Sequence, residues 1–351
     1  MADISNFDDL NALKQKNVRK MWIAIITTIV VMIVAFMVCM GVGNYSVGYV
    51  EMIMAIFGKG DDDAVIMMIH DVRLPRVMAA AMVGAALSIA GLAMQSLFKN
   101  PMASPSILGI SSGAAFGASL AISFGLGSGI FGNVATPGMA FIMCFVTMGL
   151  VYLIARSKYG VSTVTLLLGG VAVGAFFNGL VSLMQYIADE DVLASIVYWT
   201  MGSFNKVTWD SFIRSFFPIL IGVMMLAIIY RELNLISAGE EQAANLGVNV
   251  KRIRLIAITA TSLCVAGSVS LAGTISFVGL IVPHIFRMIV GPNHKMLIPM
   301  CIFGGAAFLM IMDTIAKAAF VSSFPVGIFT ALLGAPFFVY VLRRRKKEMW
   351  E

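Results

Sequence analysis

The sequence predicts an all-α membrane protein, a polytopic bundle of about ten transmembrane helices with both termini in the cytoplasm. Of its 351 residues, 60% are hydrophobic and only 12% are charged, whereas soluble globular chains have about 45–50% and about 25%. Ten apolar runs approach the length of about 20 residues that a helical crossing needs. Basic residues collect on alternate connections between these runs. Together, these observations exclude a soluble enzyme.

The ten runs are continuous and lack the alternation of barrel strands, so we expect helices. The runs lie at 22–42, 77–97, 106–124, 135–155, 162–187, 212–230, 254–272, 275–290, 297–316 and 326–342. We expect a cytoplasmic tail at 1–19, a permease domain at 20–342 and a basic cytoplasmic tail at 343–351. The first run follows a polar segment and is expected to be a retained helix, not a removed signal peptide. The eighth run is short and contains Pro283, and broken spans are typical of transporters.

The charge distribution predicts the orientation. With the N-terminus in the cytoplasm, 18 of the 24 basic residues fall on inside segments, as the positive-inside rule requires for an even number of crossings. The six outside residues are Lys59, Arg73, Arg76, Lys206, Arg214 and Lys317. The net charge of +6 therefore reflects membrane topology, and we expect contact with lipid and none with nucleic acid.

The sequence offers no catalytic or metal-binding pattern. His70, His284 and His294 do not pair with each other or with a carboxylate at a metal-binding spacing. The cysteines lie inside apolar runs without a CxxC motif, so we interpret them as small packing residues; they are Cys39, Cys144, Cys264 and Cys301. No GxxxxGK[ST] motif occurs, so any ATP that drives this protein must be bound by another chain. We expect no cofactor.

Small residues recur at helical spacing inside the runs. Gly109, Gly113 and Gly117 form overlapping GxxxG pairs, and Gly170 with Gly174 forms another. Such residues let helices approach closely. Packing within one bundle is the main interpretation, and a seam between two copies is the alternative at each site. The single acid inside a run, Asp313, is interpreted as a structural residue that bonds a neighbouring loop, with a translocation role as the alternative.

The inside loop 231–253 is the longest cytoplasmic loop. Ser237 and Glu240 have the spacing of a capping box, the residues after them favour a short helix that includes Ala243 and Leu246, and Gly247 can end it. Two turns are unstable alone in water, so docking against the bundle or a cytoplasmic protein would stabilise the helix. An ordinary helix lying on the membrane surface is the alternative.

Two outside arginines flank a proline at the entrance of the second run. Arg73 and Arg76 enclose Leu74 and Pro75, and a residue before proline favours an extended conformation. Guanidinium groups bind carboxylates in bidentate geometry. We therefore favour recognition of an acidic partner over snorkelling of long side chains at the interface.

Several segments resemble one family. They read Arg73-Leu-Pro-Arg76, Asn100-Pro-Met-Ala103, Gly273-Thr-Ile-Ser-Phe-Val-Gly-Leu-Ile-Val-Pro-His-Ile-Phe-Arg287, Pro325-Val-Gly-Ile328 and Gly334-Ala-Pro-Phe337. In this order they are similar to the FecCD-type permeases of type II ATP-binding-cassette (ABC) importers, which take up iron-siderophores, haem and cobalamin. The resemblance covers about Arg73 to Leu342.

The resemblance implies a ten-helix permease in a prokaryotic cell membrane. It implies a homodimer or a pair with a related permease, two cytoplasmic ABC ATPase subunits that bind ATP, and an external substrate-binding protein. The family's coupling helix, which enters a cleft in the ATPase, matches Ser237, Gly239, Glu240, Ala243, Leu246 and Gly247. Its external basic residues, which meet glutamates of the binding protein, match Arg73, Arg76 and Lys317.

The substrate expected from the resemblance is an iron(III)-siderophore-type metal chelate, with haem or cobalamin as the alternative. Two other classes of protein compete with this prediction. An ion-coupled secondary carrier would need more charge inside the membrane than these runs contain. A membrane scaffold without transport would have less reason to break its helices.

Overall fold

The structure is a computed structural model, and it describes residues 7–43, 45, 47–59, 62–126, 132–157, 160–319 and 324–348. The first half contains α1 (Phe7–Gly41), α2 (Tyr49–Ile56), α3 (Asp63–Met67), the π-helical turn η1 (Met68–Arg73), α4 (Leu74–Leu97), η2 (Pro105–Leu108), α5 (Ile110–Ser123), η4 (Gly132–Val134), α6 (Ala135–Ala155), β1 (Arg156–Ser157), β2 (Gly160–Val161), α7 (Thr163–Ile187) and α8 (Glu190–Thr200). The second half contains α9 (Trp209–Ile228), α10 (Tyr230–Ala238), α11 (Glu240–Asn245), α12 (Val250–Ala272), α13 (Val278–Val290), α14 (His294–Ala319) and α15 (Val326–Glu348).

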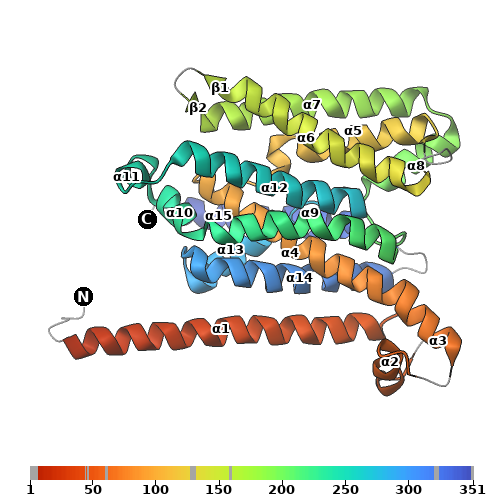
Figure 1. Cartoon of the computed structure of the whole chain (residues 1–351), viewed down its shortest axis with the longest axis horizontal. Coiled ribbons are helices and arrows are strands. Elements are labelled where there is room, and N and C mark those ends of the chain that lie inside the picture. The colour runs from red at the N-terminus through yellow and green to blue at the C-terminus, as the bar shows by residue number, and fades with distance from the viewer. Residues whose placement is uncertain are drawn as a thin grey trace.

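The long helices run parallel or antiparallel to one another in stacked layers (Figure 1). In this view α5, α6, α7 and α8 form the upper layer, α4, α9 and α12 lie in the middle, and α14 and α1 lie below. The short antiparallel pair β1–β2, with Arg156 opposite Val161, connects α6 to α7. The fold is therefore a helical bundle, as the sequence predicts.

The predicted crossings correspond to ten helices of the structure. Among the described residues, seven helical segments are long and apolar enough to span a membrane, and Ile110–Ser123, Val278–Val290 and Val326–Tyr340 are shorter apolar helices. Two ends differ from the prediction. Helix α1 already begins at Phe7, inside the expected tail, and α15 continues to Glu348. Apolar runs do not mark these ends because a helix can continue into polar sequence.

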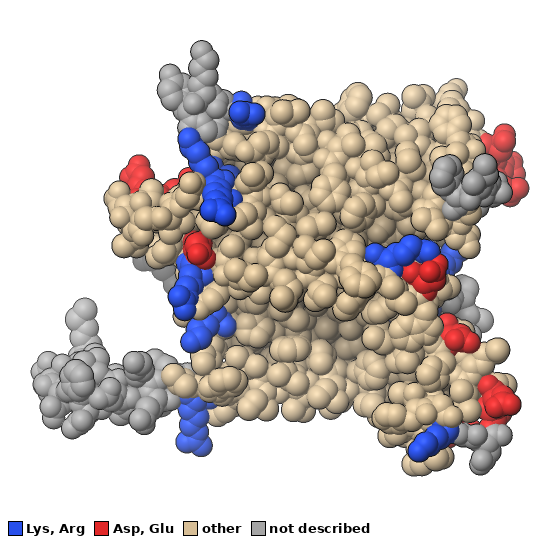
Figure 2. Space-filling model, viewed as in Figure 1, with Lys and Arg blue, Asp and Glu red and all other residues tan. Residues whose placement is uncertain are grey.

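The two ends of the bundle differ in charge. Helix α11, the start of α1 and the end of α15 lie at one end, and α2 and α3 lie at the other (Figure 1). On the face shown in Figure 2, Lys and Arg gather at the α11 end and most Asp and Glu at the opposite end. By the positive-inside rule the α11 end is cytoplasmic, so the folded arrangement of the charges is consistent with the orientation expected from the sequence.

Helix α4 forms the centre of the bundle, and glycines set how closely its neighbours approach. In the most hydrophobic stretch of the continuous helical segment Asp63–Leu97, which ends with α4, 78% of the residues are buried, against 22% for Val18–Gly41 of α1. A Cβ atom on Gly84 would overlap the carbonyl oxygen of Gly305 in α14, and one on Gly91 would overlap Gly279 in α13. Cβ atoms on Gly113 and Gly117 would meet α6. These small residues therefore pack within one chain, which confirms the main interpretation of their spacing.

Two connections lead into short helices. Between α4 and α5 the chain passes through η2, which begins with Pro105. Between α12 and α13 it turns at Gly273 (φ +70°) and at Phe277, a non-glycine residue with φ +66°. Because α5 and α13 have only 14 and 13 residues, at 1.5 Å per residue each is about 20 Å long. That length is shorter than the hydrocarbon core of about 30 Å, so the broken spans predicted from the sequence are present.

Candidate functional site

The cytoplasmic loop forms the predicted short helix. Helix α11 spans Glu240–Asn245. It ends in a turn in which Gly247, at φ +85°, donates its N–H to the Ala244 carbonyl oxygen at 2.9 Å. The Val248 N–H then bonds the Ala243 carbonyl oxygen at 3.0 Å. A left-handed glycine at this position is the usual end of a helix, and Gly247 has the structural role that its sequence predicts.

The predicted capping box is wrong. Ser237 lies inside α10, where its hydroxyl donates to the Asn234 carbonyl oxygen at 2.8 Å. Glu240 pairs with an arginine of α12 and caps nothing. The reason is that α10 buries Leu233 and Ile236, and this apolar contact continues the helix through Ser237. Its hydroxyl then bonds its own helix, as serine commonly does inside helices.

The surface of α11 is divided between the bundle and the solvent. Ala243 is fully buried, whereas Leu246 is 69% exposed. Gly239 has an extended φ of 170°, which any residue adopts, and a Cβ atom there would approach only the side chain of Gln242. Leu246 and its exposed neighbours thus form the accessible surface, and the backbone does not require glycine at position 239.

A buried arginine fixes α11 to two other elements. The guanidinium of Arg254, near the start of α12, donates to Glu240 Oε1 at 2.6 Å and to the Val161 carbonyl oxygen at 2.6 Å. It also contacts Thr163 Oγ1 at 3.4 Å. Arg254 is only 7% exposed. One side chain therefore joins α11, α12 and the start of α7.

A second polar network anchors α10. Asn234 Oδ1 accepts the backbone N–H of His294 at 2.8 Å and contacts its Nδ1 at 2.7 Å. The other ring nitrogen of His294 contacts the hydroxyl of Ser96 in α4. The helix that precedes α11 is thus held by the ends of α14 and α4.

At the outer end, Arg76 and Asp313 form a buried salt bridge. Arg76 Nε and Nη2 donate to Asp313 Oδ2 at 2.7 Å and Oδ1 at 2.9 Å, and the two residues are 8% and 4% exposed. This is bidentate geometry, and it joins α4 to α14. Asp313 is therefore a structural residue, but its partner is a neighbouring helix and not a loop.

The other two basic residues of the predicted docking set, Arg73 and Lys317, lie around the end of α1. Arg73 Nη1 donates to the Met40 carbonyl oxygen at 2.8 Å, and Nη2 donates to that of Tyr45. Lys317 Nζ donates to the Val42 carbonyl oxygen at 3.0 Å. The last carbonyl groups of a helix lack partners within the helix and carry partial negative charge, which cations stabilise. Arg73 and Lys317 therefore fasten α1 to η1 and α14.

These contacts correct one expectation about the arginines. The sequence suggested guanidinium groups that project from the entrance of a span, but Arg73 is only 4% exposed and both arginines bond groups of their own chain. The partners are distant in sequence, at separations of 33 and 237 residues. For that reason the local motif could not reveal them.

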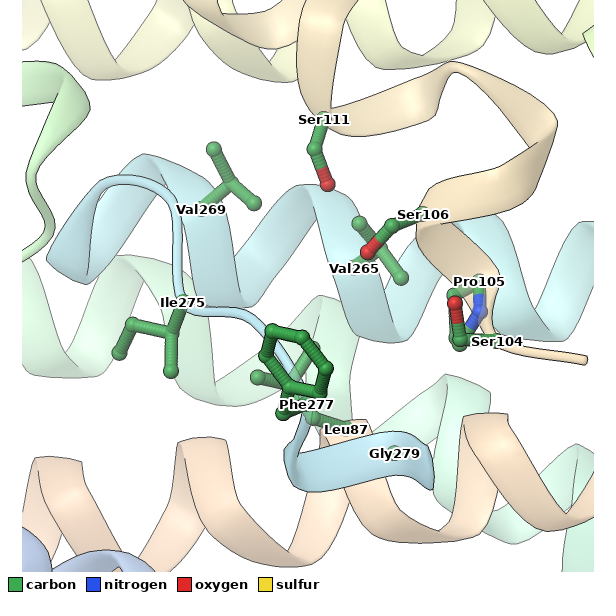
Figure 3. Close-up of a pocket in the computed structure, with 10 residues that line it drawn as sticks. All are labelled: Leu87, Ser104, Pro105, Ser106, Ser111, Val265, Val269, Ile275, Phe277 and Gly279. Atoms are coloured by element: carbon green, nitrogen blue, oxygen red, sulfur yellow. The ribbon is translucent and has the colours of Figure 1, made fainter. Parts of the chain in front are cut away.

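The two broken connections meet at a small pocket (Figure 3). Its walls come from η2 and α5, from α4 and α12, and from the start of α13 with the segment before it. The lining residues are Leu87, Ser104, Pro105, Ser106, Ser111, Val265, Val269, Ile275, Phe277 and Gly279. The hydroxyls of Ser106 and Ser111 point toward the space opposite Phe277. Its volume of about 20 Å³ is enough for about one water molecule and far too small for a metal chelate.

Sequence reasoning missed the anchoring roles of Arg254, Asn234 and His294. Arg254 follows two other basic residues, Lys251 and Arg252, and nothing local distinguishes it from them. Helix periodicity could have placed Arg254 on the buried face of α12, because Ala257, Ile258 and Thr261 lie three, four and seven residues later and are buried.

Comparison with known proteins places these features in a family. The chain matches the FecCD transport family over residues 29–344. It is 37% identical over 322 residues to the molybdate import system permease protein MolB of Haemophilus influenzae, across 89% of this chain and 94% of that protein. It is 42% identical over 275 residues to the cobalamin import system permease protein BtuC of Halobacterium salinarum, across 78% and 73%.

A solved structure agrees with this assignment. An inward-facing metal-chelate type ABC transporter superposes with a TM-score of 0.81 at 34% identity, covering 91% of this chain and 98% of that chain. The comparison therefore agrees with the helical bundle described above, which is the fold of a multi-pass membrane protein. The chain belongs to the FecCD transport family and is the transmembrane permease subunit of an ABC transporter.

Proposed function

We propose that this permease imports an iron(III)-siderophore-type metal chelate. An external substrate-binding protein delivers the chelate, and two cytoplasmic ABC ATPase subunits drive its passage. The permease works as a homodimer or with a related permease. ATP binding closes the ATPase pair, moves the α11 helices and switches the path between outward-open and inward-open states, so that the work comes from different contacts in two states.

The observation that supports the ATP-driven part of this proposal is the surface of α11. Leu246, a large apolar side chain, is 69% exposed at the cytoplasmic end of the bundle. Helix α11 itself is tied to the bundle by Arg254. A short, anchored helix with an exposed apolar residue is suited to enter a groove of a cytoplasmic partner. The matched family supports an ATPase as that partner.

Substitution of Leu246 by aspartate is expected to abolish binding of the ATPase. Leu246 would bury its side chain in the partner, and a carboxylate there would lose that apolar contact and carry a desolvation cost, together more than about 2 kcal/mol. Co-purification of the ATPase with the permease in detergent measures the effect. Asn245→Asp, on the same exposed turn, is the matched control and should retain the ATPase. Full retention by Leu246→Asp would contradict the proposal.

At the outer end, we propose that Arg73, Arg76 and Lys317 attract an acidic binding protein by their combined charge. Among the described residues, only Arg76 of these three forms a salt bridge, and Arg73 and Lys317 bond backbone carbonyl groups. In the part of the chain that the structure describes, the buried Arg73 and the half-buried Lys317 therefore add two positive charges at the outer end without a carboxylate partner. Charge of this kind steers association and fixes the orientation of the partner.

Lys317→Gln is expected to slow association of the binding protein, most strongly at low ionic strength, because one uncompensated charge is removed while a hydrogen-bond donor to the Val42 carbonyl group remains. The association rate is measured by surface plasmon resonance on permease in nanodiscs at several salt concentrations. Lys59→Gln, an exposed lysine at the same outer end, is the matched control and should cause a smaller change. Equal effects of the two variants would leave only general electrostatic attraction and would contradict a docking role for Lys317.

The identity of the cargo is tested by transport. The pocket in Figure 3 is too small for a chelate, so we propose that the path runs between two permease chains. The solved metal-chelate type transporter supports a chelate, while the relatives named for molybdate and cobalamin define the alternatives. ATP-dependent uptake into proteoliposomes that contain permease, ATPase and binding protein should be measured with a ferric hydroxamate siderophore, haem, cobalamin and molybdate. Uptake of another compound in preference to the siderophore would overturn the assignment.

A further inference from the structure

We propose that Arg254 is the positioning residue that transmits movement of α11 to α7 and through it to the wall of the pocket between the broken connections. The inference rests on the proposed function, because it assumes that the ATPase moves α11. It adds a named residue and a direction to that movement. Its basis is the place of one buried guanidinium where three elements meet.

The contacts of Arg254 are divided between the two sides of this junction. Toward α11, Nη2 donates to Glu240 Oε1 at 2.6 Å. Toward α7, Nη1 donates to the carbonyl oxygen of Val161, in β2, at 2.6 Å, and Nη2 lies 3.4 Å from Thr163 Oγ1. A guanidinium is planar and rigid and has donors in several directions. It can therefore hold both partners at once, which a single ammonium group cannot do in the same geometry.

Burial makes these contacts difficult to exchange. The Arg254 side chain is 8% exposed and that of Glu240 is 36% exposed. A buried cation that leaves its partners loses both its hydrogen bonds and the opposing charge. Displacement of Glu240 by the ATPase should therefore carry the guanidinium with it, and the Val161 carbonyl group and the start of α7 should follow.

Helix α7 continues this connection to the pocket. Gly170 lies against the backbone of Ile107 and Leu108 in η2. A Cβ atom added to Gly174 would lie only 3.2 Å from the Cα of Gly109. A shift of α7 in this tight contact would clash with η2 unless η2 also moved, because close-packed groups do not deform continuously. Ser106 in η2 and Ser111 in α5 line the pocket.

The test uses the complete transporter in proteoliposomes and measures both ATP hydrolysis and uptake. With Arg254→Gln we expect the ATPase to stay bound and hydrolyse ATP, while the substrate transported per ATP falls by about tenfold, within the usual range of coupling between sites. Arg252→Gln is the matched control, because it makes the same change two residues away on an exposed side chain. It should keep the wild-type ratio of substrate transported to ATP hydrolysed. Arg254→Lys, which keeps the charge but not the divided contacts, should fall between the two.

A charge swap separates transmission from stability. The double variant Glu240→Arg, Arg254→Glu restores opposite charges between α11 and α12, but a carboxylate cannot donate to the Val161 carbonyl oxygen. A role limited to holding α11 on α12 predicts recovery of the transport ratio in the swap. Transmission to α7 predicts no recovery, even when the thermal stability of the transporter returns to that of the wild type.

The outcomes also separate this inference from the proposed function. If the wild-type transporter binds no ATPase and shows no ATP-dependent uptake, the proposed function fails. If the wild type transports and Arg254→Gln or the charge swap keeps the wild-type ratio of transport to hydrolysis, only the role of Arg254 is refuted. If Arg254→Gln does not fold, Glu240→Gln replaces it. This variant removes the charge of the partner and keeps a hydrogen-bond acceptor. Its ratio of transport to hydrolysis is compared with that of Glu241→Gln, the control on the exposed face.

Discussion

Asp313→Ala is expected to destabilise the permease by about 3–5 kcal/mol, because it leaves the Arg76 guanidinium buried without its carboxylate. The two side chains form two hydrogen bonds of 2.7 and 2.9 Å between α4 and α14. A loss of this size is a large part of the stability of a typical domain, about 5–15 kcal/mol. We expect little monodisperse protein after extraction in detergent, and a lower Tm for what remains, measured by size exclusion and thermal unfolding.

An exposed pair at the same outer end provides the control. Asp210 and Arg214 form an ion pair one helical turn apart, with side chains 77% and 37% exposed. Such pairs contribute about 0–1 kcal/mol, so Asp210→Ala should leave the Tm nearly unchanged. The double variant Arg76→Leu, Asp313→Leu should recover much of the loss, since it removes both buried charges. A Tm for Asp313→Ala equal to that of Asp210→Ala would show that the buried pair is not needed for folding.

Gly91→Val is expected to prevent normal packing of α4 against α13. A Cβ atom at position 91 would overlap the carbonyl oxygen and the Cα of Gly279, and these backbone atoms cannot move without moving the helix. Extra volume in a packed core usually costs about 1–3 kcal/mol, and occasionally more; we expect the upper part of that range or beyond. Separation of the two helices should also widen the pocket that Gly279 lines.

The matched control for Gly91→Val is Gly179→Val in α7. A Cβ atom at position 179 has nothing within 4 Å, so this variant carries the same change in side chain, helix propensity and hydrophobicity without the overlap. Thermal unfolding in detergent should show a large decrease in Tm for Gly91→Val and a small one for Gly179→Val. Similar decreases would mean that helix propensity, and not close approach, explains the effect.

The positions of the helices were predictable from the sequence because the membrane restricts the possible structures. A segment in lipid must satisfy its backbone hydrogen bonds internally, so a long apolar run implies a helix. The run at 135–155 corresponds to α6, Ala135–Ala155, and the run at 162–187 to α7, Thr163–Ile187. The structure corrects the ends that lie in water, such as the start of α1 at Phe7, where this constraint does not apply.

The candidate sites were predictable only in part. The short helix α11 and its terminating Gly247 follow from local residue preferences, which act over a few positions. The capping box failed because the burial of Leu233 and Ile236 extended α10 through Ser237. Tertiary packing therefore overrode a local signal that was present in the sequence.

The sequence by itself determined the class of protein, the number and order of the crossings, the orientation in the membrane and the location of α11. These properties follow from hydrophobicity, charge position and local helix signals, each of which can be evaluated along the chain. Only the tertiary structure decided which charged groups are buried and what they bond. Arg76 meets Asp313 across 237 residues and Arg254 meets Val161 across 93. Partners at such separations are set by how the helices pack, and packing depends on the shapes of all the contacting faces together.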